Sequence, residues 1–429
     1  MCSQEIIEVI TELKHFLMHT DTMKQYRVSE SDFSRSPIDG KSKQTFSSYA
    51  LLCISSLKKS LSVELYNLLT INKLKVITKG GYSQGRYKIQ SIFYKAWNDK
   101  LLSLIYPSIE SNSLNKGKLG CDKKWKGYGI DSIDGSKVTV PQTKDLSAHF
   151  GTQTGGSEGN PTATAMCGVL CRADMLAGYV KDAEVFKLAV GELTVCKSWL
   201  WKLENTSITL FDRGFASANC FAFLVAQSKP FVCRLKIGFN QVVSDFMLSD
   251  ATDKEVFFTS NSSEKFVHQA LTQAQIAGED PCEDCYTQIS KGENVKIRLV
   301  KIVLSSGEIE ILATNLYDKN EISVMDLSEL YQMRWGIELI FDSLKNQLQM
   351  MVFSGIKAEA VLQEIYASVF TYNLRQLLIN EAQQMVDQVQ EEEEVVVVEK
   401  VQETQQVTDE VFKKKEKTSV SKKSIKMLP

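Results

Sequence analysis

DLSELYQMRWGIELIFDSLKNQLQMM, residues 326–351, predicts a single long helix. Asp326 with Glu329 three residues later is typical of a capping box at a helix start, and no proline interrupts the segment. Apolar side chains recur along it near helical spacing: Leu327, Leu330, Ile337, Ile340, Phe341, Leu344 and Leu348. Because this spacing gathers apolar side chains on a broad face, most of the helix is expected to be buried.

Four further side chains of this helix form a polar stripe: Tyr331, Arg334, Glu338 and Lys345. Their spacings of 3, 4 and 7 residues put them within one narrow strip of the helix surface. Ionisable groups on a mostly apolar helix must be desolvated unless they face a cleft, so the stripe predicts a cleft. The alternative is a solvated helix face on which Arg334 and Glu338 form an ordinary ion pair.

Composition limits the class of protein. The chain has 429 residues, 43% hydrophobic and 24% charged, enough for a large core in roughly two or three domains. Its apolar runs fall far short of the roughly 18 residues that cross a bilayer, and its acidic, amphipathic N-terminus is unlike a signal peptide. Ten scattered cysteines indicate reduced thiols in a cytosol. The single pair Cys282 and Cys285 favours an ordinary loop over a zinc site.

The N-terminal part is basic and helical. Residues 1–127 hold 20 Lys and Arg against 11 Asp and Glu, which fits a phosphate-binding module. We expect helices in 1–106, a turn at 79–84, and a basic linker at 107–126. The turn followed by a basic helix is compatible with a helix-turn-helix in which Lys79, Arg86 and Lys88 contact DNA. The alternative is a plain helical bundle with exposed lysines.

From Tyr128 the pattern changes to short β runs and helices, which predicts a mixed α/β sheet. Residues 128–134 and 137–141 form two strands separated by Gly135 and Ser136, and the run ending at Asp212 forms a buried strand. Residues 237–294 are irregular, and a hairpin follows at about 295–315. Another helix covers roughly 357–385. The biased tail, 386–429, is expected to be disordered or a loose helix, with a coiled-coil segment as the alternative.

Three carboxylates lie on separate predicted elements: Asp134 and Asp212 at strand ends, and Glu338 on the long helix. Functional side chains collect at such strand ends. Carboxylates that converge repel one another, and divalent cations relieve that repulsion. Each residue also has a plainer interpretation: Asp134 in a hairpin turn, Asp212 capping a helix, and Glu338 pairing with Arg334. Asp131 is a rival to Asp134.

A family resemblance covers about residues 30–380. Asp134-Gly135-Ser136 resembles the Asp-Gly-Thr block of bacterial insertion-sequence transposases, and residues 211–215, FDRGF, resemble their second-aspartate block. Tyr331, Arg334, Glu338 and Lys345 match the Tyr-Arg-Glu-Lys signature of the insertion-sequence-four type of DDE transposase. Residues 353–367 and Asn373 look like the family's usual sequel. The tail from 386 resembles nothing in the family.

The resemblance implies a ribonuclease-H-like core over 127–385, with an inserted β-rich region at about 237–315. It implies Mg²⁺ or Mn²⁺ held by Asp134, Asp212 and Glu338, cleavage of double-stranded DNA at an element's ends, and strand transfer into target DNA. Tyr331, Arg334 and Lys345 would hold terminal phosphates, and Trp335 would stack on a base or pack in the core. The expected assembly is a homodimer in a bacterial cytoplasm, associated with the nucleoid. The alternatives are a nuclease without strand transfer and an inactive DNA-binding relic.

Overall fold

A nine-stranded mixed sheet runs through the first of two units, Met1–Gln376; the second is Leu377–Pro429. This computed structural model describes residues 4–34, 44–55, 58–71, 73, 76–106, 123–155, 162–261, 263–287, 292, 294–304, 306–387 and 390. Most of the predicted linker and nearly all of the predicted tail lie outside these residues. Within the described residues, no helix is both long and apolar enough to cross a membrane.

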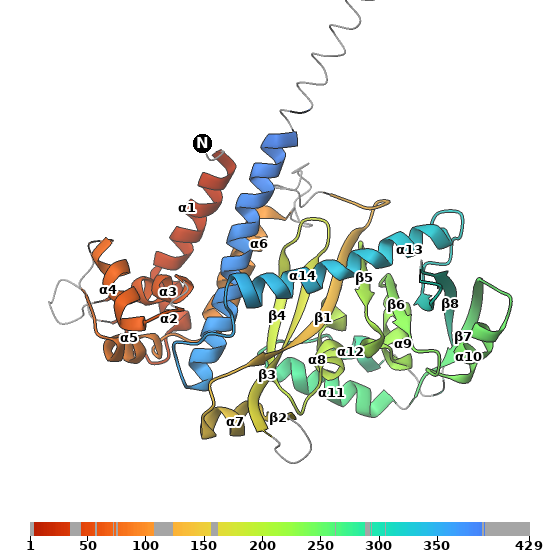
Figure 1. Ribbon diagram of the computed structural model, residues 1–429, viewed down its shortest axis with the longest axis horizontal. Coiled ribbons are helices and arrows are strands. Elements are labelled where there is room, and N and C mark those ends of the chain that lie inside the picture. The colour runs from red at the N-terminus through yellow and green to blue at the C-terminus, as the bar shows by residue number, and fades with distance from the viewer. Residues whose placement is uncertain are drawn as a thin grey trace, which may run out of the picture. The chain divides into compact units, whose positions relative to one another are not determined.

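The central strands have the order β4-β3-β1-β5-β6. They are β1 (Gly129–Thr139), β3 (Thr162–Asp174), β4 (Val180–Lys187), β5 (Ser207–Phe211) and β6 (Phe231–Leu235), with short β2 (Thr152–Gly155) beside β3. β1, β3 and β4 pair antiparallel, whereas β5 and β6 run parallel to β1 (Figure 1). Three antiparallel strands followed by two parallel strands form the ribonuclease-H-like core, as the resemblance predicted.

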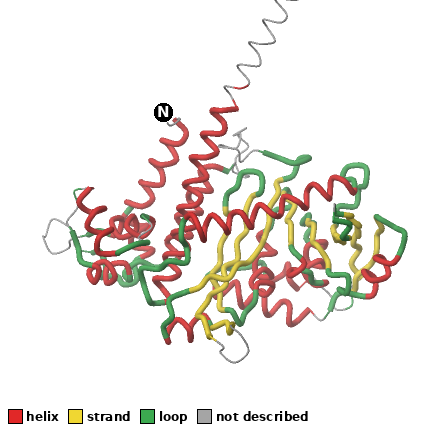
Figure 2. Tube along the Cα trace, in the orientation of Figure 1, coloured by secondary structure: helices red, strands yellow, loops and turns green. Residues whose placement is uncertain are grey.

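Apolar layers cover both faces of the sheet, so its central strands are buried on both sides. On one face, helices α8 (Glu192–Trp199), α9 (Ala218–Ala226), α10 (Gln241–Leu248), α11 (Ser263–Ile276) and α12 (Glu283–Thr287) pack with side chains such as Ile133 and Phe211. On the other face, Ile130, Ile208 and Leu210 pack against Leu327 and Leu330 of the long helix. The sheet is therefore a middle layer between helices (Figure 2).

The insertion between β6 and the long helix extends the sheet. Strands β7 (Asp253–Thr259), β8 (Asn294–Val303) and β9 (Ile309–Thr314) add to β6 in the order β6-β9-β8-β7. The predicted hairpin is therefore confirmed as β8 and β9. Residues 237–294 are not irregular: they carry α10, β7, α11 and α12, and their mostly polar outer faces hid the periodicity. Cys282 and Cys285 form a disulfide, which corrects the expectation of reduced thiols for this pair.

The N-terminal helices are α1 (Gln4–Met18), α2 (Thr20–Tyr26), α3 (Phe46–Ile54), α4 (Leu61–Ile71), α5 (Lys79–Arg86) and α6 (Ile92–Ile105). The predicted turn at 79–84 is wrong, because Thr78 caps α5 and the glycines lie inside the helix. These helices pack on helical residues 358–376. Trp97 stacks on Phe370 with ring centroids 4.2 Å apart, and Asn373 donates to Asn98 over 2.7 Å.

The predicted long helix is present as a continuous series of turns. It comprises α13 (Val324–Gln332), a 3-10 turn at Met333–Trp335, α14 (Gly336–Asp342) and a π turn at Ser343–Gln347. Its start differs from the prediction, because Ser323 is the N-cap and Asp326 completes the capping box three residues later. Ile337, Ile340 and Leu344 are buried, as predicted.

Candidate active site

Asp134 and Asp212 are neighbours across two parallel strands. Ile133 of β1 pairs in register with Phe211 of β5, so the next residue of each strand is an aspartate. Asp134 does not lie in a hairpin turn, because β1 continues unbroken through Gly135 to Thr139. The Asp212 side chain makes no capping hydrogen bond to the turn that follows it. Both plainer interpretations of these aspartates are therefore wrong.

The long helix brings Arg334 and Glu338 to the same place. Arg334 is buried; its Nη2 donates to Glu338 Oε1 over 2.8 Å, and its Nη1 lies 3.6 Å from Asp134 Oδ2. Glu338 does pair with Arg334 on the same helix, and the Glu338 side chain is 42% exposed, but the guanidinium of the pair is buried and also faces Asp134. The guanidinium thus connects the first and third predicted carboxylates.

The surroundings of Asp134 disfavour its charged form. Burial raises the pKa of Asp134 to about 6; the Gly135 N–H and Arg334 oppose this rise, and the charges of Glu192 and Asp212 add to it. The Gly135 N–H donates to Asp134 Oδ1 over 2.9 Å and so orients the carboxylate. Among the described residues, no group of three or more His, Cys, Asp or Glu is arranged to hold a metal ion. The metal assignment of Asp134, Asp212 and Glu338 therefore stays a prediction.

Asp131, the rival first carboxylate, belongs to a different cluster. It is fully buried, and Lys181 Nζ donates to its two carboxylate oxygens over 3.0 and 3.2 Å. Arg172 Nη1 lies 3.6 Å from the same carboxylate. Because Asp131 and Asp134 are three residues apart on a strand, their side chains point to opposite faces. Asp134 is therefore the better candidate.

The remaining stripe residues differ in their surroundings. Lys345 donates from Nζ to Ser136 Oγ over 2.6 Å, and burial lowers its pKa. Tyr331 is buried and its hydroxyl donates to the Phe211 carbonyl over 3.3 Å, so it anchors the helix to β5 and does not offer its hydroxyl to a phosphate. Trp335 does not pack in the core: it is 58% exposed, with the Arg334 guanidinium 5.0 Å from its ring centroid.

Sequence reasoning missed Glu192. This residue occupies the first turn of α8, and its carboxylate lies over Gly135: a Cβ built there would be 2.4 Å from Glu192 Cδ. Burial raises the pKa of Glu192, Lys137 opposes the rise, and the charge of Asp212 adds to it. No motif or periodicity marks Glu192, because tertiary packing alone brings α8 to β1.

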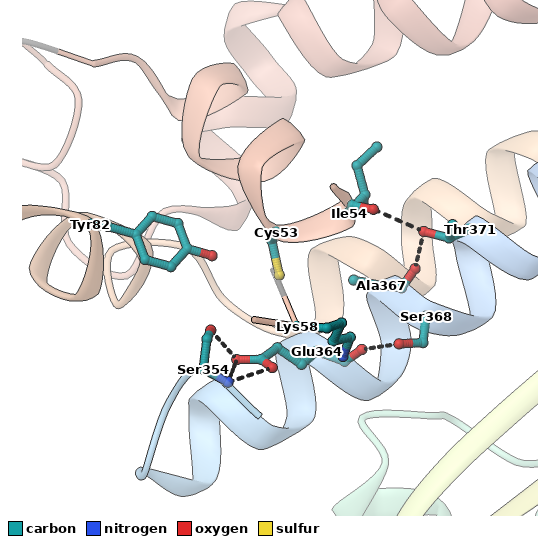
Figure 3. A pocket seen from close by; sticks show the side chains of 9 residues that line it. All are labelled: Cys53, Ile54, Lys58, Tyr82, Ser354, Glu364, Ala367, Ser368 and Thr371. Atoms are coloured by element: carbon teal, nitrogen blue, oxygen red, sulfur yellow. Dashed lines mark hydrogen bonds between the residues drawn. The ribbon is translucent and has the colours of Figure 1, made fainter. Parts of the chain in front are cut away.

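Arg86, predicted to contact DNA, is instead buried in the packing of α5 on residues 354–364. Its Nη1 donates to Glu364 Oε1 over 2.6 Å and its Nε to Gln363 Oε1 over 2.8 Å. The Glu364 carboxylate also accepts from Ser354, beside a cavity of about 10 Å³ (Figure 3). The assignment of Arg86 to DNA is corrected on this ground.

Two of the predicted N-terminal DNA contacts are accessible. Lys79 is exposed in the first turn of α5. The Lys88 side chain is 47% exposed and lies 3.2 Å from Asp32 Oδ1. Lys79 is therefore accessible on α5, and Lys88 is accessible in the turn between α5 and α6.

Residues 125–374 match the family model of the transposase DDE domain. The transposase InsG of insertion sequence element IS4, from Escherichia coli strain K12, is 22% identical over 255 residues, which cover 58% of this chain and 52% of that protein. The chain thus spans about half the length of this curated relative. The cryo-EM structure of the piggyBac transposase synaptic complex with hairpin DNA superposes with a TM-score of 0.43 at 10% identity, covering 88% of this chain and 76% of that chain.

Proposed function

The chain belongs to the transposase DDE domain family, and from that premise we propose that it cleaves DNA at the ends of an insertion sequence and joins them to target DNA. One observation carries the proposal. Asp134 and Asp212 end paired regions of adjacent parallel strands, and Arg334 links Asp134 to Glu338 from the facing helix. These contacts support the proposal that the three carboxylates, which come from three elements, act together at one edge of the sheet.

The donor set suits Mg²⁺ or Mn²⁺, which prefer carboxylate oxygens. Its charge suits them as well, because burial raises the pKa of Asp134 despite the opposing charge of Arg334, and the charges of Glu192 and Asp212 add to the rise. Asp134, Asp212 and Glu338 would hold the cations. When bound, these ions polarise the phosphoryl group and lower the pKa of the attacking water or hydroxyl.

Arg334 contacts two carboxylates in the protein alone and exchanges them for a DNA phosphate when DNA binds. In the protein alone its guanidinium separates Asp134 from Glu338. Once the carboxylates are otherwise neutralised, its planar fork is free to take two oxygens of a DNA phosphate. Lys345, which donates to Ser136 two residues beyond Asp134, adds a point charge for the same backbone. The Arg334 guanidinium and the Lys345 ammonium group bind the scissile phosphate and hold it beside the carboxylates.

The DNA itself needs contacts beyond the cleavage point. Lys79 on α5 and Lys88 in the turn after it supply exposed positive charge for phosphates of the element's end. A homodimer that pairs two ends, acting on the nucleoid in a bacterial cytoplasm, completes the proposal.

The test uses the full chain, a duplex carrying the inverted repeats that flank its gene, a supercoiled target plasmid and Mg²⁺. We expect metal-dependent end cleavage and joined products, and Asp134→Asn, Asp212→Asn and Glu338→Gln each should abolish both. Glu329→Gln, the same chemical change at an exposed site on the same helix, should leave both intact. Cleavage without joining would indicate a nuclease; binding without cleavage would indicate an inactive relic.

A further inference from the structure

Glu192 lies closer to the candidate centre than its position in the sequence suggests. An added Cβ at Gly135 would lie 2.4 Å from Glu192 Cδ and 2.7 Å from its Oε1. Real Cβ atoms do not approach other atoms so closely, so the Glu192 carboxylate takes the space that a side chain at 135 would fill. Gly135 directly follows Asp134 and its N–H donates to Asp134 Oδ1, so the Glu192 carboxylate approaches this part of β1 from the opposite face of the strand.

Within the described residues, this carboxylate has no partner. Among the described residues, Glu192 makes no hydrogen bond or ion pair. Lys137, whose charge acts on it, donates instead to Gln153 over 3.0 Å. A half-buried carboxylate beside two others costs folding free energy unless something neutralises it.

A second observation indicates that the centre is incomplete in the protein alone. The Arg334 Nε is buried, yet it has no hydrogen-bond acceptor within the described part of the chain. Native proteins leave few buried N–H groups unsatisfied, and each one that remains needs an explanation, such as a bound water, an ion or a catalytic role. In the described part of the chain, this region therefore holds a carboxylate and a guanidinium N–H that both lack a partner.

We propose that Glu192 is a fourth carboxylate of the centre, which helps Asp134 and Asp212 to hold divalent cations. The inference rests on the proposed function, because that function supplies the cations. Glu192 approaches from α8, on the sheet face opposite to the one that α13 covers. It thus offers oxygen ligands from a side that Glu338, on the long helix, does not occupy. The alternative is that Glu192 merely packs on Gly135.

Calorimetric titration of the full chain with Mg²⁺ and with Mn²⁺ separates the two roles. With Glu192→Gln we expect metal affinity to fall about tenfold or more, as removal of a charged ligand does. The melting temperature without metal should stay the same or rise, because one repelling charge is removed. Unchanged metal affinity with a lower metal-free melting temperature would leave Glu192 with a packing role and overturn the proposal.

Gly135→Ala provides a second variant, because its methyl group must displace the Glu192 carboxylate while that residue keeps its charge. It should weaken metal binding, and Glu192→Gln combined with Gly135→Ala should weaken it no further than the stronger single change. Full additivity of the two losses would contradict the proposal.

Two control variants allow a negative result of the metal titration to be interpreted. Glu329→Gln should leave the titration unchanged. Asp134→Asn separates this inference from the function on which it rests. If Asp134→Asn weakens metal binding and Glu192→Gln does not, only the role of Glu192 is lost. If neither variant affects metal binding, the proposed metal centre is lost with it.

Discussion

Two buried arginines, Arg86 and Arg334, each form an ion pair with a glutamate, but their surroundings differ. Arg86 donates from Nε to Gln363, from Nη1 to Ser354 and Glu364, and from Nη2 to the Ala360 carbonyl. Arg334 donates to Glu338 and approaches Asp134 at 3.6 Å, and its Nε has no acceptor among the described residues. One guanidinium is fully satisfied and the other is not.

The difference separates a structural role from a functional one. A satisfied buried network rigidifies the packing around it, and removing one member leaves an uncompensated charge. A partly satisfied network near repelling carboxylates has free hydrogen-bonding capacity for a ligand. We therefore expect Arg86 to determine stability and Arg334 to determine activity.

Replacing Arg86 should have the largest effect. Arg86→Met leaves Glu364 buried without its cation, and breaking such a pair costs about 3–5 kcal/mol of unfolding free energy. Urea denaturation of the full chain measures this loss. Arg86→Met combined with Glu364→Leu should recover part of it, because both charges are then absent. A loss below about 1 kcal/mol would show that the network around Arg86 is not structural.

Replacing Arg334 should have the opposite effect: a large loss of activity and a small change in stability. Arg334→Ala should reduce DNA cleavage by about 10²–10³-fold, the usual cost of removing one donor that stabilises a transition state. Stability should change little, because the Glu338 side chain is 42% exposed and remains solvated. Arg334→Lys should restore only part of the activity, since an ammonium group lacks the fork. Equal losses of stability for Arg334→Ala and Arg86→Met would remove the distinction.

Metal binding should depend on pH through Asp134. Burial raises the pKa of this carboxyl to about 6, so it retains a proton until about that pH. Because a ligand must be deprotonated, apparent metal affinity should fall about tenfold per pH unit below 6 and be flat above 7. The free energy of unfolding without metal has the opposite pH dependence. The raised pKa of Asp134 favours folding at low pH, and this contribution is lost as pH rises through about 6.

Titrations between pH 5 and 8 check this profile. Asp134→Asn should flatten it, whereas Arg86→Met should leave its shape unchanged. A profile in Asp134→Asn that is identical to that of the unmodified chain would assign the titration to another group.

Replacing Lys345, like replacing Arg334, should reduce activity and not stability, but by a smaller factor. Lys345→Met should weaken cleavage or end-DNA binding about tenfold while metal affinity survives, because the ammonium serves the phosphate and not the cation. Ser136→Ala keeps the charge and removes only its hydrogen-bond acceptor, so it is the matched control. Equal loss of metal binding and cleavage would make Lys345 structural.

The smallest effect concerns Lys79, an exposed N-terminal cation in contrast to Arg86. Lys79→Ala should weaken binding to all DNA sequences and reduce the salt slope by about one unit. The full chain is required, because the N-terminal helices pack on residues 354–373. Lys265→Ala, an exposed change on α11, is the control; an identical slope for both variants would remove the N-terminal helices from the DNA interface.

Periodicity and strand ends predicted much of this molecule. The burial of Ile337, Ile340 and Leu344 follows from helical spacing. The strands that carry Asp134 and Asp212 were also predicted, although β1 does not end at Asp134 but continues to Thr139. Both depend on local pattern, which a single sequence displays.

Tertiary packing decided the rest. Gly80 and Gly81 indicated a turn, yet Thr78 caps a helix that contains both. Tyr49 packs against the same helix at Gly85, where a Cβ would lie 1.9 Å from its ring. Glu192 and Arg86 acquire their roles from partners distant in the sequence, Gly135 and Glu364. No window of neighbouring residues contains that information.

The pairing of Arg86 with Glu364 also sets an order of events during synthesis. The two residues are 278 positions apart, which corresponds to roughly 15–55 s of translation at about 5–20 residues per second. Throughout that interval α5 has been synthesised, but the Glu364 carboxylate that its arginine requires has not. The first helices to be made are therefore among the last to reach their final packing, and a chain that terminates before residue 364 lacks it altogether.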